Sequence, residues 1–416
     1  MLPKSPLKRL KTAGERRVAS VMIGLVICTV VSQTCAAATF LLFANSLGTA
    51  DFGKLSGAMF FQQFFSTLSV SGFRNVVIRE LVKHPEQQNA ITGSYLFLSG
   101  GIGLVMVFLL AIASLLVPID SGERMAYLVI SIGHVGACLI PNAIYDAKGQ
   151  QVRGASIAAC VDVIAVMLTS ALFGLEMISV PIAASLVAGK WTLVAAASLT
   201  DLAVRNADFR PSFDWSQASS LWKSARMMSI ATTLNVAPLS LGVSLTRILF
   251  GAGEAGLFAI AAFVLRSHVT VIGLLTRTVF PHVVSATGET PSFARRVFAA
   301  FGGVTLLVTT AAFACSEVAL AFFLPSEYQA SRITIAIVLL AGTVRVAGVV
   351  GNMYLVAQYS EQALVAIAIV GVAVFAIALV IPLPVCGRNQ MALALLASSA
   401  TMAVNLLYRQ RDSRFS

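Results

Sequence analysis

Charged residues are scarce in this 416-residue sequence: Asp, Glu, Lys and Arg make up 11% of it, whereas 57% of the residues are hydrophobic. A typical soluble domain has about 25% charged residues, so the composition excludes an ordinary water-soluble globular protein. Acidic residues are the scarcer sign, 18 against 29 Lys and Arg, and mean hydropathy is +0.86. A chain of this kind needs lipid as the solvent for much of its surface.

Motifs for catalysis and for metal binding are missing as well. The six cysteines lie in or beside apolar runs without CxxC spacing, and His134 and His268 lack the spacing of metal ligands. No GxxxxGK[ST] motif is present, which excludes ATP hydrolysis by a P-loop. We therefore expect no enzyme activity, no metal and no cofactor. Because no stacked aromatic platform accompanies the basic residues, we also expect no nucleic-acid partner.

What the sequence has instead is a series of apolar runs about twenty residues long, which is the length of a membrane-spanning helix and twice that of a barrel strand. We expect an all-α integral membrane protein with about twelve transmembrane helices. The predicted spans are 18–44, 53–73, 91–117, 125–145, 154–174, 177–200, 227–250, 255–276, 297–324, 333–357, 362–383 and 389–408.

Orientation follows from the positive residues, which short cytoplasmic segments retain. The N-terminal segment alone carries Lys4, Lys8, Arg9, Lys11, Arg16 and Arg17, and with that end inside, most of the remaining Lys and Arg also fall in cytoplasmic segments. Both termini are therefore predicted to be cytoplasmic. The expected parts are a basic N-terminus (1–17), a six-helix lobe (18–200), a cytoplasmic linker (201–226), a second six-helix lobe (227–408) and a cytoplasmic tail (409–416).

A local internal repeat supports this division. Residues 47–58, LGTADFGKLSGA, align with 250–261, FGAGEAGLFAIA, at an offset of 203, which pairs Gly48 with Gly251 and Asp51 with Glu254. An even number of spans separates the two copies, so both have the same orientation. Two six-helix lobes related by an axis along the membrane normal are the expected architecture.

The linker is predicted to contain a short amphipathic helix at the cytoplasmic interface. Asp214 can cap a helix that begins at Trp215, with Gln217 completing a capping box. Trp215, Ala218 and Trp222 would then share one face. The simplest interpretation is a segment that lies on the membrane surface.

Charged side chains deep in the spans indicate an anionic cargo. Lys190, Arg266 and Arg345 lie near the middle of predicted helices, where each charge costs about 2.5–3.5 kcal/mol on insertion scales. We predict that they line a water-filled cationic cavity that binds a diphosphate, and we assign Arg247 to the same cavity. Asp162 in the fifth span is the candidate ion-coupling group. In the alternative interpretation, Asp162 pairs with one cation while the others reach carbonyl groups or water.

Three further basic residues, Arg74, Arg79 and Arg277, fall at the predicted cytoplasmic ends of helices. They are candidates for a cytoplasmic mouth that attracts a diphosphate head group. Ordinary positive-inside anchoring is the alternative, and Arg79 followed by Glu80 is typical of a surface pair.

The segment LGTADFGKLSGAMFFQQFFSTLSVSGFRNVVIREL, Leu47 to Leu81, resembles the opening signature of the polysaccharide-biosynthesis flippases. The second lobe repeats it with LTRILFGAGEAGLFAIAAFVLR, Leu245 to Arg266, and IPNAIYDAKGQQVRGASIA, Ile140 to Ala158, resembles the family's connection between the fourth and fifth helices. This family belongs to the superfamily that also contains multidrug and toxin extruders. Two departures are Thr246-Arg247, where many relatives have Asp-Arg, and the depth of Pro238 in the seventh helix.

The resemblance implies a V-shaped pair of bundles that flips an undecaprenyl-diphosphate-linked oligosaccharide across the bacterial inner membrane for O-antigen, exopolysaccharide or capsule synthesis. It also implies membrane lipids, a polysaccharide polymerase and chain-length proteins as partners. One alternative is a cation-coupled multidrug antiporter of the same superfamily, which would need acidic residues in the first lobe, where only Asp162 qualifies. Another is a glycan polymerase or ligase, which the short predicted outside loops disfavour.

Overall fold

The structure, a computed structural model, describes residues 6–116, 119–205, 209–285, 291–357, 361–381 and 387–412. Within these ranges the side chains are also described, with the main exceptions of those in 6–19, 274–300 and 349–361. Every regular element among these residues is helical, which confirms the all-α prediction. In chain order they are α1 (Pro6–Ser66), η1 (Thr67–Ser71), α2 (Gly72–Lys83), η2 (Pro85–Gln87), α3 (Gln88–Leu116), α4 (Ser121–Cys138), α5 (Asn142–Ala147), α6 (Gln151–Gly174), α7 (Val180–Arg205), α8 (Trp215–Phe250), α9 (Ala252–Ser285), α10 (Pro291–Phe322), η3 (Ser326–Ser331), α11 (Arg332–Ala357), α12 (Glu361–Val380) and α13 (Arg388–Asp412).

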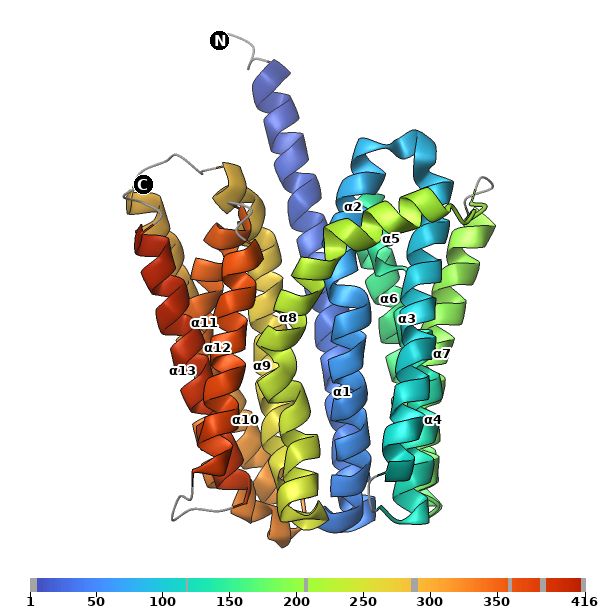
Figure 1. The fold of residues 1–416 in the computed structure, drawn as a ribbon, viewed down its shortest axis with the longest axis vertical. Helices are drawn as coiled ribbons and strands as arrows, with labels where there is room; N and C mark the ends of the chain where they lie inside the picture. The colour runs from blue at the N-terminus through green and yellow to red at the C-terminus, as the bar shows by residue number, and fades with distance from the viewer. Residues whose placement is uncertain are drawn as a thin grey trace.

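Eleven helices of the described chain are long and apolar enough to cross a membrane, and the first of these, Ser20–Lys83, contains two crossings. At 64 residues it would extend for roughly 95 Å if straight, about three times the thickness of a bilayer core. Figure 1 shows that α1 descends through the bundle, reverses, and ascends beside itself. The described helices therefore provide twelve crossings, the number expected from the sequence.

The reversal in α1 occurs at Gly48, whose φ of 66° and ψ of 173° lie in a region of backbone conformation that is essentially restricted to glycine. Gly251, between α8 and α9, has nearly the same conformation, with φ 95° and ψ 169°. These residues are the pair aligned by the sequence repeat. The two halves of the chain thus use the same turn at the same point, because only a residue without a Cβ can reverse the helix there.

The helices form two lobes, α1–α7 and α8–α13 (Figure 1). Both glycine turns lie at one end of the bundle, which we call the turn face, and α1 begins and α13 ends at the opposite end, the terminal face. Since the equivalent turns lie at the same face, the two copies run in the same direction. This arrangement agrees with the predicted axis along the membrane normal.

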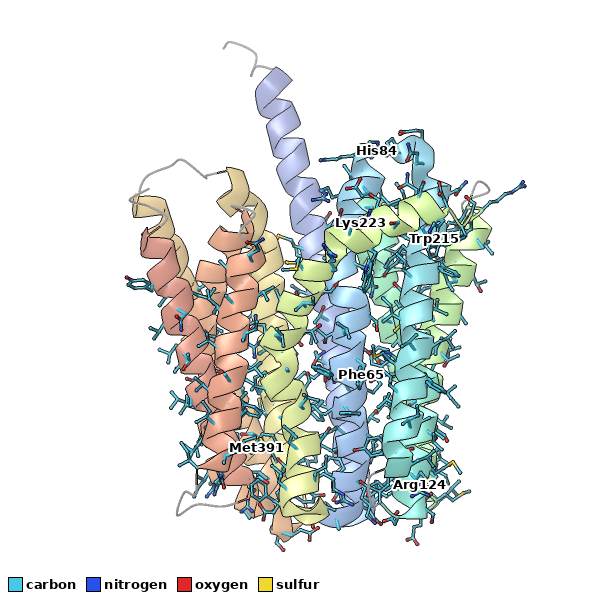
Figure 2. All side chains as sticks on the ribbon, viewed as in Figure 1. Phe65, His84, Arg124, Trp215, Lys223 and Met391 are labelled. Atoms are coloured by element: carbon cyan, nitrogen blue, oxygen red, sulfur yellow. The ribbon has the colours of Figure 1, made fainter. Side chains whose placement is uncertain are left out.

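Helix α8 differs from the prediction because it runs without interruption from Trp215 to Phe250. The expected short amphipathic helix is its first part, which crosses the terminal face where Trp215 and Lys223 lie (Figure 2). In this first part of α8, Leu221 and Ala225 are buried against the first lobe together with Phe73 of α2. From Trp215 onward, the predicted linker is therefore continuous with the seventh crossing.

The predicted capping box forms only in part. Asp214 does cap α8: its carboxylate accepts hydrogen bonds from the Ser216 hydroxyl and amide, both at 2.8 Å, and these bonds lower the pKa of the Asp214 carboxyl. Gln217, however, donates to Gln87 at 2.6 Å, and the Asp214 amide donates to Ser94 of α3. Tertiary contacts to the first lobe thus replace the reciprocal half of the box.

The largest apolar core lies toward the turn face and joins the two lobes. Phe43, Phe52 and Leu55 of α1 are fully buried there against Phe258 of α9 and Tyr328 of η3. Large apolar side chains such as Phe108, Leu307 and Val380 are instead exposed, as expected for surfaces that face lipid. Both lobes therefore contribute to one continuous core at the turn face.

Candidate substrate cavity

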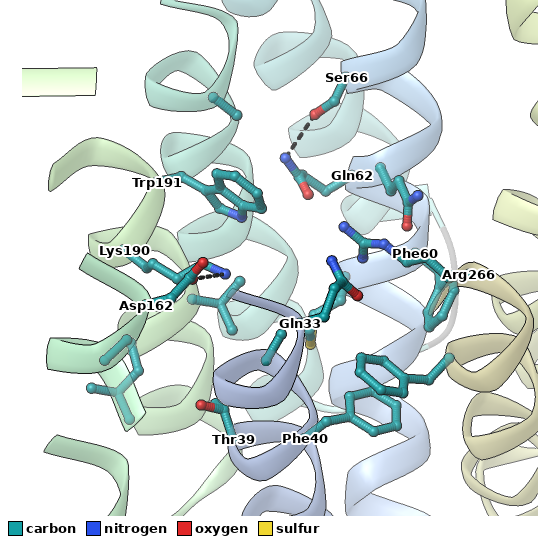
Figure 3. Close-up of a pocket in the computed structure, with 18 of the residues that line it drawn as sticks. Gln33, Thr39, Phe40, Phe60, Gln62, Ser66, Asp162, Lys190, Trp191 and Arg266 are labelled. Carbon is teal, nitrogen blue, oxygen red and sulfur yellow. Dashed lines mark hydrogen bonds and ion pairs between the residues drawn. The ribbon is translucent and has the colours of Figure 1, made fainter. Parts of the chain in front are cut away.

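A cavity of about 310 Å³ lies between α1, α4, α6, α7 and α9, so it is bounded mainly by the first lobe and closed on one side by the second (Figure 3). Most of its lining residues come from the interior of these helices, and Ala137, Ile140 and Asn142 come from the segment that runs from the end of α4 to the start of α5. The volume is at the lower end of the range for small-molecule sites, about 300–1,000 Å³.

Helix α9 contributes Phe263 and Arg266 to this cavity, and Arg266 is its charged residue. The preceding turns of α9 are rich in small residues, and Ala259, Ala261 and Ala262 are buried against α1, which brings the helix close enough for the arginine to reach inward. Figure 3 shows its side chain directed toward Gln33 and Gln62. Within the described part of the chain, the guanidinium group has no hydrogen-bond or ion-pair partner. Its five N–H donors are thus available to a ligand.

Lys190 and Asp162 lie on the opposite wall of the cavity (Figure 3). The Lys190 Nζ is 3.1 Å from an Asp162 oxygen and 4.5 Å from the centre of the Trp191 ring, and Ser32 donates a hydrogen bond to the same carboxylate. Two cations and one carboxylate leave the described lining with one net positive charge. Asp162 therefore has partners, as in the structural alternative considered from the sequence, and Lys190 is only partly neutralised.

Two other predicted cavity residues lie elsewhere. Arg345 of α11 donates to the backbone and side-chain oxygens of Asn235, at 2.6 and 3.0 Å, and so joins α11 to α8. Arg247 forms an ion pair with Glu123 at 2.5 Å near the turn face. Neither lines the described cavity, because each helix turns that side chain toward a neighbouring helix.

Of the three residues predicted at the cytoplasmic mouth, the two whose side chains are described, Arg74 and Arg79, have separate acidic partners. Arg74 forms an ion pair with Asp146 of α5, with an Nε to Oδ2 distance of 2.7 Å. Arg79 is more exposed and contacts Glu80 at 3.1 Å. The side chain of Arg277 lies outside the described residues. Arg74 thus has a structural role in holding α2 against α5 at the terminal face.

At the turn face the two lobes are sealed by symmetric contacts. A Cβ on Gly53 would lie 1.8 Å from the Ala252 carbonyl oxygen, and one on Gly256 would lie 2.0 Å from that of Thr49. These are the same contact made in both directions, since each residue is 203 positions from its equivalent. The cavity is therefore closed toward this face by backbone packed directly against backbone.

Charged residues reinforce the seal. Glu123 of α4 is fully buried and pairs with Arg247, while Glu327 of η3 accepts from the Thr49 amide at 3.2 Å. Beside them, Asp120 accepts from Lys54 at 2.7 Å and from the Glu123 amide, and these bonds lower the pKa of the Asp120 carboxyl. At this end, the two lobes are thus joined by an ion pair and a hydrogen bond in addition to the packing of glycine backbone.

Sequence reasoning missed the uncharged polar part of the cavity. Gln33, Gln62, Gln63 and Ser66 of α1 all line it, and Trp191 borders it from α7. The available signal was the placement of three glutamines inside apolar runs, where polar side chains are rare and face the protein interior. Glu123 was also missed, because its partner is 124 residues away in the sequence.

Comparison with known proteins agrees with this geometry. A family model described as polysaccharide biosynthesis protein matches residues 21–286, more than half of the chain. No curated protein sequence matches significantly. Among solved structures, an inward-facing multidrug resistance MATE family transporter of the MOP superfamily has a TM-score of 0.69 and 13% identity, covering 94% of this chain and 98% of that one. The lipid II flippase MurJ, in an inward closed conformation, also has a TM-score of 0.69 and 13% identity, covering 94% and 87%. These similarities show that the fold is that of a membrane transporter.

Proposed function

Because the chain belongs to the polysaccharide biosynthesis protein family, we propose that it flips an undecaprenyl-diphosphate-linked oligosaccharide across the bacterial inner membrane. The cargo would serve the assembly of a surface polysaccharide, such as O-antigen, exopolysaccharide or capsule. In this proposal the protein is a transporter rather than an enzyme, and its partners are the lipid-linked oligosaccharide, membrane lipids, and the polymerase and chain-length proteins that consume the cargo.

The observation that carries the proposal is Arg266, which projects into the mid-membrane cavity with no partner among the described residues. An unpaired cation at this depth is costly, so a ligand of opposite charge is its natural complement. A guanidinium can donate two parallel hydrogen bonds to phosphate oxygens, which suits a diphosphate. Lys190 on the facing wall supplies a second positive group when the anion draws it from Asp162.

Orientation supports the direction of transport. With the basic N-terminus in the cytoplasm, the terminal face is cytoplasmic and the sealed turn face is periplasmic. The structure then corresponds to a state whose cavity is closed to the periplasm by the glycine contacts and by the Arg247 and Glu123 pair. Transport would require these contacts to separate while the opposite end closes.

The main alternative is a cation-coupled drug antiporter. Such a protein would place an available carboxylate in its cavity, whereas Asp162 already has Lys190 and Ser32 as partners. The unpartnered charge in the described lining belongs instead to Arg266. A cationic drug would be repelled by it, so the geometry favours an anionic cargo.

The test is replacement of Arg266 with Ala, Gln and Lys in a bacterial host that depends on this protein for polysaccharide export. Ala and Gln should stop export and cause lipid-linked oligosaccharide to accumulate on the cytoplasmic face. Lys should retain part of the activity, because it keeps the charge but loses the planar fork. Folded protein is measured in detergent, and Arg332→Ala is the matched control, since that arginine is exposed and pairs with Glu317 far from the cavity. Full export by the Arg266→Ala variant would overturn the proposal.

A further inference from the structure

The cavity contains more than charges. Gln33, Gln62 and Gln63 line it from the two crossings of α1, and Figure 3 shows Gln33 and Gln62 on the side of the cavity near Arg266. Ser66 lies one turn beyond Gln62, toward the terminal face. A carboxamide both donates and accepts hydrogen bonds, as a sugar hydroxyl does, whereas a phosphate oxygen can only accept. These side chains therefore match a group other than the diphosphate.

The glutamines have free hydrogen-bonding capacity. The Gln63 side-chain oxygen is buried and has no donor within the described part of the chain. The Gln33 oxygen accepts only a long contact from Ser267 among these residues, at 3.5 Å. Leaving a buried amide oxygen without a donor is unfavourable, so such groups beside a cavity are normally satisfied by a ligand or by water.

Gln62 is held in one orientation by residues behind the cavity wall. Its amide nitrogen donates to Ser66 Oγ at 2.8 Å and lies 3.5 Å from His134 Nδ1. Ser66 Oγ in turn lies 3.0 Å from the same ring nitrogen, and the other ring nitrogen is 3.4 Å from Cys138 Sγ. With its nitrogen engaged, the Gln62 oxygen is directed away from His134 and can accept a hydrogen bond from a ligand. His134, which is fully buried, is thus a positioning residue.

The size and charge of the site restrict what it can enclose. About 310 Å³ cannot surround an entire oligosaccharide, so only the sugar next to the diphosphate would be enclosed. The lining has one net positive charge, and its two cations lie beside the position assigned to the diphosphate. Because the diphosphate engages Arg266 and Lys190, a carboxylate on that sugar would find no further cation among the described lining residues. Burying a charge without a partner is unfavourable, so an uncharged sugar fits and a uronic acid does not.

We propose that Gln62, Gln63 and Gln33 form a subsite that recognises an uncharged sugar, hydroxylated or acetamido-substituted, attached directly to the lipid diphosphate. This inference rests on the proposed function, because it assumes that Arg266 binds the diphosphate. It assigns specificity to the glutamines and affinity for the head group to the arginine. The remainder of the glycan lies outside the enclosed volume and does not determine recognition.

The test uses purified protein in detergent and three short-chain polyprenyl diphosphates, whose diphosphate carries a methyl group, a neutral N-acetylhexosamine or a uronic acid. The methyl-capped lipid has the same diphosphate charge as the sugar-bearing lipids, so the ratio of affinities isolates the sugar. The wild type should bind the neutral sugar lipid at least about tenfold more tightly than the methyl-capped lipid, since two hydrogen bonds have this effect. The uronic acid lipid should bind no more tightly than the methyl-capped one.

Gln62→Leu and Gln63→Leu should each reduce the preference for the neutral sugar several-fold, and the double variant should abolish it, with unchanged affinity for the methyl-capped lipid. That unchanged affinity also shows that the variants are folded. His134→Leu should resemble Gln62→Leu, and His134→Asn, which can still accept from Gln62, should recover part of the preference. Gln150→Leu is the matched control, because Gln150 is exposed at the turn between α5 and α6.

The two proposals fail in different ways. If the double glutamine variant keeps the preference, or if the uronic acid lipid binds as tightly as the neutral one, the sugar subsite is wrong and the flippase proposal is unaffected. If Arg266→Gln binds all three lipids as tightly as the wild type does, the diphosphate assignment is wrong and both proposals fall. If a leucine variant does not fold, Gln62→Asn and Gln63→Asn replace it, because each retains the amide but shortens its reach. A preserved preference for the neutral sugar lipid over the methyl-capped lipid would again count against the subsite.

Discussion

Gly53 and Gly256 occupy equivalent positions in the two lobes, and each packs against the backbone of the other lobe's turn. The contact is reciprocal: Gly53 meets Ala252, and Gly256 meets Thr49. Because the lobes approach so closely here, the seal depends on the absence of a side chain and not on the strength of any one interaction. A small change at this point should therefore act on the conformational equilibrium.

Gly53→Ala and Gly256→Ala should each prevent full closure of the turn face. The added methyl would lie within 2.0 Å of a carbonyl oxygen in both cases, so the backbones would have to move apart. We expect transport to fall at least tenfold, with increased reactivity of a cysteine introduced at Thr39 in the cavity toward an outside thiol reagent. Gly253→Ala is the control, because a Cβ there meets open space. Unchanged reactivity and transport in both variants would contradict the seal.

The Arg247 and Glu123 pair should contribute to the same closed state. Removing one partner leaves the other charge buried, which typically destabilises by about 3–5 kcal/mol. Glu123 is fully buried, so Glu123→Arg or Arg247→Glu alone should open the turn face or reduce the yield of folded protein. The double variant, with Glu123→Arg and Arg247→Glu, should restore both closure of the turn face and the yield of folded protein, because it recreates the ion pair with the two charges interchanged. The readout is cysteine accessibility from outside together with the melting temperature in detergent, and failure of the double exchange would argue against the pair as a seal.

Lys190 and Asp162 should respond asymmetrically to mutation. Lys190→Ala removes the cation nearest to Asp162 and leaves a buried carboxylate, so both the melting temperature and transport should fall. Asp162→Asn keeps a hydrogen-bond acceptor for Ser32 and frees Lys190, so binding of a lipid diphosphate should be retained or strengthened. Binding and melting measurements on the single and double variants check this coupling. If Lys190→Ala and Asp162→Asn lose diphosphate binding equally, the prediction is wrong and Asp162 itself contributes to binding the cargo.

Membrane orientation can be checked by cysteine labelling in a background that lacks the native cysteines. A cysteine at Gly122 or Gly253, both near the turn face, should react with an impermeant thiol reagent in intact cells. One at His84, which Figure 2 shows at the terminal face, should react only after the membrane is permeabilised. The expected pattern follows from the basic N-terminus. The opposite pattern would invert the topology and, with it, the proposed direction of transport.

Much of the architecture could be predicted from the sequence, because the length of the apolar runs and the positions of two glycines determine it through local constraints. Apolar runs of about twenty residues can only form spanning helices in lipid, so the twelve crossings were predictable. The pairing of Gly48 with Gly251 predicted a repeated turn, and both residues adopt a conformation that other residues avoid. Asp214 marked the start of α8 for a similarly local reason, since its side chain caps the helix that follows.

The candidate site was predictable only in part. Lys190, Arg266 and Arg345 stood out because charges are costly in the membrane, but hydropathy does not encode how a helix is rotated when both lipid and protein interior are apolar. The rotation directs Arg266 into the cavity and Arg345 toward Asn235. The sequence by itself thus determined the spans, the repeated turns and the presence of deep positive charge, through local constraints of solvation and backbone conformation. The tertiary structure alone decided which cation remains unpaired, which glutamines join it and where the lobes close, because those outcomes depend on contacts between different helices.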